Sequence, residues 1–296
     1  MNIQQISTFV WVIKLGGFRR AADKLNASQG AISARIAALE EQLGHVLLER
    51  GSGGIRPTPK GCEFLAYAEQ VLRLTDDVQT RLARPDHMRG TLRLGVSETI
   101  VHSWLPIFLS EFATSYPRIE LDLSVDVTVN LRDALLGRSI DLAFLLGPVS
   151  EFSVTNVKLA SFEMGWLAGP KTASGFERRK RDELLSETPI VTFARNTRPF
   201  NDVRVSVCKL GFPTVRIFPT TSLAAGYQMV RHDVAIGALP IELIAEPVGS
   251  LSITPIDIGL KLKPLSFTAS YVGDPPNGLA AEAAAMAEKI AARPRS

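Results

Sequence analysis

The chain has 296 residues, of which 46% are hydrophobic and 21% are charged, and its formal net charge is +3. This length suits about two globular domains. No apolar run approaches the length of about 18 residues that a membrane span needs, and the N-terminus lacks a basic, apolar leader, so we expect a cytoplasmic protein without membrane contact.

Residues 18–43 predict two helices joined by a short turn. Apolar residues recur at helical spacing in residues 18–25 and again in residues 32–43, and Ser28 between them is a good N-cap. The second helix turns small residues outward, so it can enter the DNA major groove, although any two-helix corner shows the same periodicity. Donors for base edges and phosphates stand on this helix at Gln29, Ser33 and Arg35.

The glycine-rich residues 50–59 predict a two-stranded wing beside these helices. Arg50, Arg56 and Thr58 can then meet DNA phosphates, whereas the alternative is a loop whose arginines face water. Charge favours the first interpretation, because residues 1–90 carry the whole net charge of +3 and the remainder is neutral. Three charges alone are also compatible with an ordinary solvated surface.

From residue 60 to about residue 84 the pattern is helical and carries a heptad stripe. A helix with such a stripe needs a partner, either the same helix of a second subunit or the C-terminal domain of its own chain. Pro85, Asp86 and Gly90 then predict a hinge. The residues of the stripe are Phe64, Ala68, Val71, Thr75, Val78 and Leu82.

Strands and helices alternate from residue 90 onward, which predicts an α/β fold. Residues 92–96 and 121–127 read as alternating strands, and residues 140–147 as a strand buried on both faces. A similar order follows in residues 164–239, so we expect two lobes, each with a parallel sheet. Residues 265–272 should return to the first lobe, before an alanine-rich closing helix.

Ligands of open α/β sheets bind beyond the carboxyl ends of the strands, where helix starts converge. Hydroxyls and free N–H groups at helix starts favour an anion, and Arg195 would add a carboxylate partner. Each Ser or Thr taken singly is more often an ordinary helix cap. The expected effector residues are Ser97, Thr99, Thr128, Phe144, Phe193, Arg195, Thr221 and Ser222.

The sequence predicts neither catalysis nor a metal site. His102 lies near Ser97 and Glu98, but no GxSxG elbow, P-loop, GxGxxG or HExxH accompanies them. Cys62 and Cys208 lack a CxxC spacing, so no disulfide framework is expected. We expect both to be buried free thiols, Cys208 within a strand.

One family resemblance covers nearly the whole chain. Phe9, residues 16–44, LLER at 47–50 and PTPKG at 57–61 closely resemble the winged helix-turn-helix of LysR-type transcriptional regulators, and a weaker match continues to the end. At several positions this chain has a different residue from the one that is usual in the family. These departures are Gly17 for Ser, Gly30 for Pro, Ala34 for Arg, Leu48 for Phe, and Arg231-His232-Asp233 for a sequence with Gly.

The resemblance implies a mainly helical winged helix-turn-helix domain in residues 1–60 and a dimerisation helix with a hinge in residues 61–89. It implies an α/β, two-lobed, periplasmic-binding-protein-like effector domain in residues 90–296. Lobe I would comprise about 90–162 and 267–296, and lobe II about 163–266. The DNA contacts we expect are Arg19, Arg20, Gln29, Gly30, Ser33, Arg35, Arg50, Arg56 and Thr58.

The implied function is regulation of transcription at promoter or operator DNA, controlled by a small, anionic organic acid in the interlobe cleft. A homodimer or homotetramer is expected, with RNA polymerase as a candidate partner. No cofactor and no metal are expected.

Overall fold

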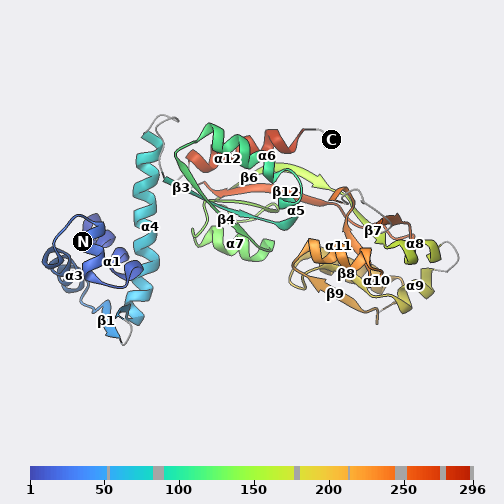
Figure 1. Cartoon of the computed structure of the whole chain (residues 1–296), viewed down its shortest axis with the longest axis horizontal. Coiled ribbons are helices and arrows are strands. Elements are labelled where there is room, and N and C mark those ends of the chain that lie inside the picture. The colour runs from blue at the N-terminus through green and yellow to red at the C-terminus, as the bar shows by residue number, and fades with distance from the viewer. Residues whose placement is uncertain are drawn as a thin grey trace. The chain divides into compact units, whose positions relative to one another are not determined.

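The computed structural model describes residues 1–51, 54–82, 90–176, 181–212, 214–243, 252–273 and 278–293, with the backbone alone at 50–51, 73 and 76–82. The chain divides into two compact units, Met1–Ala83 and Arg84–Ser296. Figure 1 labels many of the elements of each unit.

The first unit is a three-helix domain with a wing, as the sequence predicts. Helices α1 (Ile3–Leu15), α2 (Phe18–Lys24) and α3 (Gln29–Leu43) precede the antiparallel strands β1 (Leu48–Gly51) and β2 (Gly54–Pro57), and α4 (Pro59–Leu82) follows. Ser28 caps α3 by accepting a hydrogen bond from Ala31 N at 3.2 Å. In the turn before it Asn26 has a φ of +48°, a left-handed conformation that Asn tolerates.

One carboxylate ties the wing to α3. Glu40 Oε1 accepts hydrogen bonds from the backbone N–H groups of Leu47 at 2.7 Å and Leu48 at 3.1 Å, at the start of β1. Leu47 is itself buried in the core that α1, α2 and α3 share. The wing therefore starts from a fixed point on α3.

The first lobe of the second unit is a five-stranded sheet in the order β4-β3-β5-β12-β6. Helices α5, α6, α7 and α12 belong to this lobe. A buried aromatic cluster joins α6 to β5, since the Phe108 and Phe144 rings lie 5.1 Å apart. Its elements are β3 (Gly90–Val96), α5 (Glu98–Val101), α6 (Leu105–Ser115), β4 (Ile119–Val125), α7 (Thr128–Leu136), β5 (Leu142–Leu146), β6 (Val154–Phe162), β12 (Leu265–Val272) and α12 (Gly278–Ala291).

The second lobe has a five-stranded sheet of its own, in the order β11-β7-β10-β8-β9. Trp166 is buried in its core and donates from Nε1 to Leu260 O at 2.8 Å. The elements are β7 (Met164–Ala168), α8 (Pro170–Phe176), α9 (Arg181–Glu187), β8 (Ile190–Phe193), α10 (Arg198–Lys209), β9 (Ile217–Thr220), α11 (Leu223–Arg231), β10 (Ile236–Pro240), a 3-10 turn (Ile241–Leu243) and β11 (Thr254–Ile256).

The two lobes are predicted correctly, but their sheets are mixed rather than parallel. β12 runs antiparallel to β5 and β6, and β7 runs antiparallel to β10 and β11. β7 and β12 are the strands by which the chain enters a lobe from the other lobe, so each runs opposite to the strand of that lobe that leads out to the crossing, β11 or β6. The return of residues 265–272 to the first lobe is confirmed.

Three further expectations are wrong. Cys208 lies in helix α10 rather than in a strand, and both Cys62 and Cys208 are exposed. Val127 lies beyond β4, as the N-cap of α7. β4 is an edge strand, and two of its apolar residues are exposed, Leu123 at 39% and Val125 at 50%.

The departure at residues 231–233 has a physical explanation at Asp233. Its φ of +57° belongs to the left-handed region, where Gly is common and Asp is tolerated. Its carboxylate accepts hydrogen bonds from Thr172 N at 2.7 Å and Lys171 N at 3.3 Å. Asp233 thus supplies partners for N–H groups at the start of α8, which Gly could not do.

We predict that Glu40→Ala loosens the wing locally. The substitution leaves the N–H groups of Leu47 and Leu48 without their acceptor, at a cost of about 1–3 kcal/mol. Amide hydrogen exchange of residues 46–57 should accelerate, as measured by mass spectrometry of peptides. Glu41→Ala, at an exposed neighbour on the same helix, is the control. Equal acceleration in both variants would contradict the role of Glu40.

Candidate functional site

The outward face of α3 carries small and polar side chains. Gln29, Gly30 and Ser33 are exposed, as are Ala34 and Ala37 on the same helix. Together with strand residues of the wing, Gln29, Gly30 and Ser33 line a groove of about 340 Å³. Few long side chains therefore stand between the backbone of this helix and a molecule bound against its outward face.

The basic residues predicted to contact DNA have different surroundings. Arg19 and Arg56 are exposed, and Arg35 is half-buried on the flank of α3. Arg20 is exposed too, and its guanidinium donates to Leu15 O at 3.0 Å, at the C-terminal end of α1. The Arg50 side chain lies outside the described part of the structure.

Thr58 has a structural role that the sequence analysis did not assign. Its hydroxyl donates to Val46 O at 2.8 Å and accepts from Gly61 N at 3.0 Å, in the first turn of α4. The hydroxyl is thus engaged within the domain, and its phosphate contact stays a prediction. The backbone N–H is also engaged, because it donates to Leu47 O.

The predicted stripe on α4 is divided between two faces. Ala68 is 1% exposed and packs in the core of the first unit, and the Phe64 ring meets Phe9 of α1 at 5.1 Å. Ala68 is therefore covered by its own domain, and Phe64 is covered by it in part. Thr75 is half-buried, and the side chains of Val78 and Leu82 are outside the described residues. The exposed apolar face is Tyr67 at 62%, Val71 at 37% and Leu74 at 36%.

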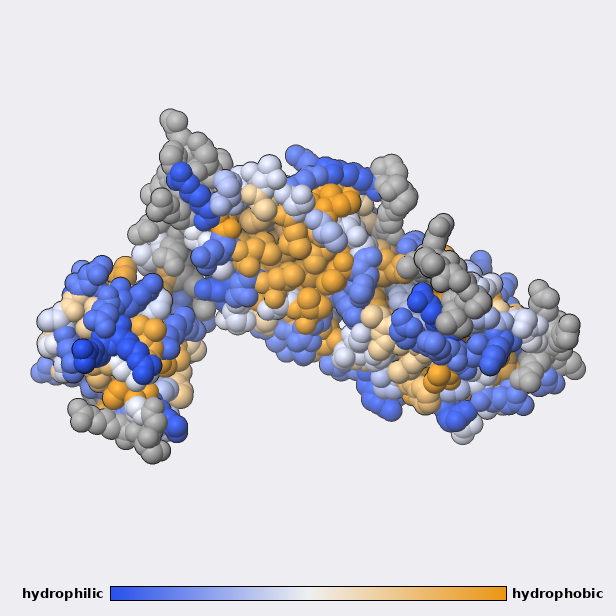
Figure 2. All heavy atoms as spheres, viewed as in Figure 1, coloured by the Kyte–Doolittle hydropathy of each residue, from blue (hydrophilic) through white to orange (hydrophobic). Residues whose placement is uncertain are grey.

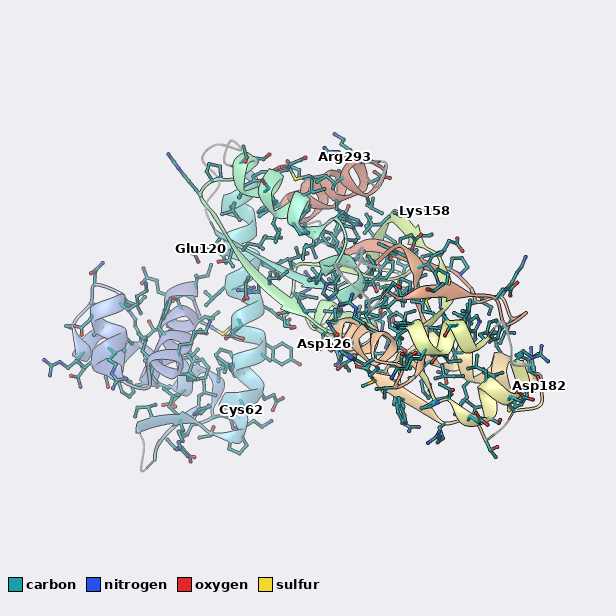
Figure 3. All side chains as sticks on the ribbon, turned by 45° about the vertical axis from the view of Figure 1, so that its right-hand side comes forward. Cys62, Glu120, Asp126, Lys158, Asp182 and Arg293 are labelled. Carbon is teal, nitrogen blue, oxygen red and sulfur yellow. The ribbon has the colours of Figure 1, made fainter. Side chains whose placement is uncertain are left out.

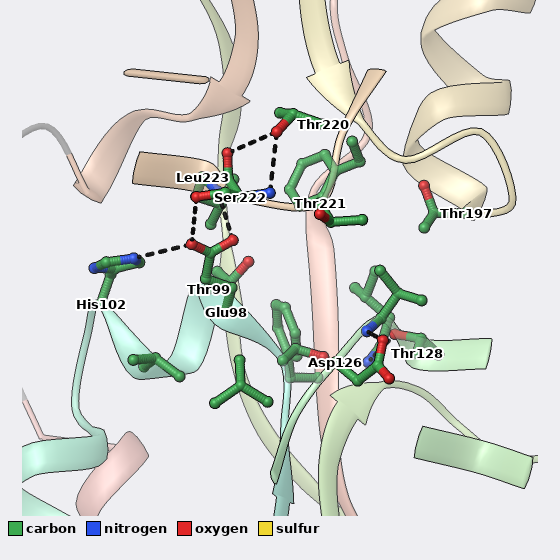
Figure 4. Close-up of a pocket in the computed structure, with 17 residues that line it drawn as sticks. Glu98, Thr99, His102, Asp126, Thr128, Thr197, Thr220, Thr221, Ser222 and Leu223 are labelled. Atoms are coloured by element: carbon green, nitrogen blue, oxygen red, sulfur yellow. Dashed lines mark hydrogen bonds and ion pairs between the residues drawn. The ribbon is translucent and has the colours of Figure 1, made fainter. Parts of the chain in front are cut away.

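In the second unit, a cavity of about 490 Å³ lies between the two lobes. Figure 4 shows its polar residues at the ends of strands and the starts of helices. Glu120 and Asp126 mark the two ends of β4 in Figure 3, and of these two residues only Asp126 lines the cavity.

Six of the eight predicted effector residues line this cavity. Phe144 does not, because it points into the core of lobe I and is fully buried there against Trp104 and Phe108. Arg195 does not line it either, since its guanidinium lies over the Phe200 ring at 5.7 Å. The six residues are Ser97, Thr99, Thr128, Phe193, Thr221 and Ser222.

Glu98 also lines this cavity, although it is not among the eight expected effector residues. From the start of α5 in lobe I its carboxylate reaches lobe II, where Oε1 accepts from Ser222 Oγ at 3.1 Å and Oε2 from Leu223 N at 2.5 Å. His102 Nε2 also lies 3.4 Å from Oε1. The one sequence signal for this role is that Glu98 stands at the start of a helix, shortly after strand β3.

The charge of the lining differs from the prediction. Glu98 and Asp126 are acidic, His102 can carry a positive charge, and none of the described lining residues is Lys or Arg. Ser97 is 8% exposed, and its Oγ has no hydrogen-bond partner among the described residues. The remaining lining residues, outside the eight expected effector residues, are Val101, Val125, Val127, Leu146, Thr197, Thr220, Leu223 and Phe267.

Two further observations concern only the described part of the chain. None of its helices is long and apolar enough to cross a membrane. No cluster of three His, Cys, Asp or Glu side chains suited to a metal ion occurs there.

Family models match both units. The model for the bacterial regulatory helix-turn-helix protein of the lysR family matches residues 3–62. The model for the LysR substrate binding domain matches residues 85–283.

Known proteins resemble the chain along most of its length. The HTH-type transcriptional regulator YofA of Bacillus subtilis is 32% identical over 242 residues, 81% of either chain. GltR of the same organism is 30% identical over 164 residues, and the match spans about half of its length (55%). The crystal structure of full-length CbnR with its target DNA has a TM-score of 0.65 at 24% identity, covers 98% of this chain and 100% of that one, and supports the fold.

We predict that Val71→Asp disrupts self-association through the exposed face of α4. A carboxylate at a position buried between two copies would lose its hydration without a partner, which is costly. Sedimentation should show a shift toward monomer. Ala66→Asp, an exposed position on another face of α4, should leave the oligomer intact. An intact oligomer in the Val71 variant would contradict a seam at this face.

Proposed function

Because the chain belongs to the LysR family of transcriptional regulators, we propose that it binds promoter DNA as a homo-oligomer under the control of a small organic effector. The relatives are regulators, so the prediction that the chain is not an enzyme is confirmed. The observation that carries the proposal is the exposed, small-residue face of α3 beside basic residues, joined in one chain to a two-lobed domain with a polar cavity.

For DNA, α3 enters the major groove and the wing meets the backbone. Gln29 and Ser33 reach base edges from the exposed face, and Arg35 reads a base or a phosphate from the flank. Arg19, Arg20 and Arg56 supply phosphate contacts, with Arg50 as a further candidate. Since its target is promoter DNA, the protein acts in the cytoplasm.

Two apolar surfaces support assembly of several copies. The exposed face of α4 suits a parallel or antiparallel helix pair, which would place two recognition helices on one duplex. The second surface lies over β4, where Leu123, Val125 and the nearby Val129 are exposed. Figure 2 shows apolar side chains gathered on this face of the first lobe. A tetramer would use both surfaces, and RNA polymerase is a further candidate partner.

The effector binds between the lobes of the second unit. Both lobes line the cavity, and a ligand that touches both can change the angle between them, because it has a different affinity for the open and closed states. The volume of about 490 Å³ suits a small organic molecule. Thr99 and Thr128 from lobe I and Thr221 from lobe II supply its polar contacts.

We predict that Arg35→Ala weakens operator binding by about 1–3 kcal/mol and relaxes sequence preference if Arg35 reads a base. Arg56→Ala should weaken binding to every sequence and reduce the slope of log affinity against log salt by about one. Titrations at several salt concentrations measure both effects. Arg204→Ala, an exposed arginine of the second unit, is the control. Unchanged affinity in both test variants would contradict the placement of α3 and the wing.

We also predict that Thr221→Val weakens effector binding by about 0.5–1.5 kcal/mol, because one hydroxyl is lost from the cavity. A thermal-shift screen of small organic compounds on the full chain identifies ligands, and calorimetry then compares the variants. Arg195→Ala should bind as the wild type does, because Arg195 does not line the cavity. A loss in the Arg195 variant alone would place the effector elsewhere.

A further inference from the structure

The carboxylate of Glu98 crosses from one lobe to the other. Its own helix, α5, belongs to lobe I, while Ser222 and Leu223 belong to the start of α11 in lobe II. The hydrogen bonds to Ser222 Oγ and Leu223 N measure 3.1 and 2.5 Å. The Glu98 side chain is only 20% exposed, so this contact is largely screened from solvent.

The start of α11 is a place that attracts an anion. The first N–H groups of a helix lack partners within the helix, and its dipole adds a partial positive charge. Ser222 satisfies one of these groups by accepting from Ala225 N at 3.3 Å. Glu98 satisfies another, at Leu223. The chain has thus already placed a carboxylate of its own where an anionic ligand would bind.

A second observation concerns Ser97, the residue next to Glu98 in the cavity wall. Ser97, next to Glu98 in the sequence, lines the cavity and is more than nine-tenths buried, and its Oγ has no hydrogen-bond partner in the described part of the chain. A buried hydroxyl without a partner is costly, and it can either donate or accept. Asp126 adds a second carboxylate to the wall, and none of the lining residues described is Lys or Arg.

We propose that Glu98 is an internal ligand that occupies the anion position of the cavity and holds the two lobes in contact. This inference rests on the proposed function, because it concerns the effector that binds in the same cavity between the lobes. The effector meets Glu98 and Ser97 with a neutral or cationic hydrogen-bonding group. An effector carboxylate reaches α11 only by displacing Glu98. The organic acid expected from the sequence was to meet hydroxyls and free N–H groups at helix starts together with Arg195, and Arg195 lies outside the lining.

Chemical rescue tests this assignment on the full chain. Glu98→Ala removes the internal carboxylate and leaves space for a small external one at the start of α11. The Tm of this variant should fall by several degrees, and about 100 mM sodium acetate should restore most of the loss by mass action, relative to equal sodium chloride. Acetamide, which has the same shape without the charge, should not restore it.

Two comparisons show whether rescue by acetate requires a vacant anion position. Wild type has its anion position filled, so acetate should leave its Tm unchanged relative to chloride. Glu98→Asp is the matched control, because it keeps the charge on a shorter side chain and should be destabilised without responding to acetate. If acetate fails to stabilise the Ala variant, or stabilises wild type equally, the proposal is wrong.

A variant that fails to fold does not end the test. Glu98→Ser vacates the same space with a polar side chain, and the same rescue is expected. Recovery of folded protein in acetate and not in chloride supports the proposal, and failure of both variants to fold in acetate contradicts it. DNA binding plays no part in these measurements, so they can fail while the proposed regulatory function stands, and the reverse also holds.

Discussion

The second unit depends on one constraint, which is that the first N–H groups of a helix have no partner within that helix. Strands β3, β4, β8 and β9 run toward the cavity, and the helices that follow them start there. Their N–H groups need acceptors. Thr197 accepts from Phe200 N, Ser222 from Ala225 N, and Glu98 from Leu223 N. The polarity of the cavity is thus a consequence of the topology.

This constraint explains why part of the site could be predicted from the sequence. Ser97 follows β3 directly, Thr128 and Ser222 come shortly after β4 and β9, and any sheet with this strand order brings such positions together. Side-chain direction is a different matter. Phe144 lies on the core face of β5, and Arg195 turns onto Phe200. The contact of Glu98 with α11 depends on the distance between lobes, which no local pattern encodes.

In the first unit too, the periodicity of the sequence predicts the helices but not what their apolar faces pack against. Helical spacing predicts its helices, and the core residues that it indicates are buried. On α4 a heptad pattern indicates that an apolar face is covered. The pattern does not indicate whether the chain's own domain or a second subunit covers it. Phe64 and Ala68 pack within their own domain, so the exposed face shifts to Tyr67, Val71 and Leu74. Likewise, hydrophobic alternation predicts strand β4 but not its place at the edge of the sheet.

The central claim is that a carboxylate of the chain itself occupies the start of α11. Amide hydrogen exchange at Leu223 tests it most directly, because that N–H donates to Glu98 across the cleft. A hydrogen bond to a charged group contributes about 1.5–3 kcal/mol. We expect the Leu223 amide to exchange slowly in the wild type and at least about tenfold faster in Glu98→Ala, with the interior of α11 less affected. Rapid exchange at Leu223 in the wild type, or equal rates in both proteins, would contradict it.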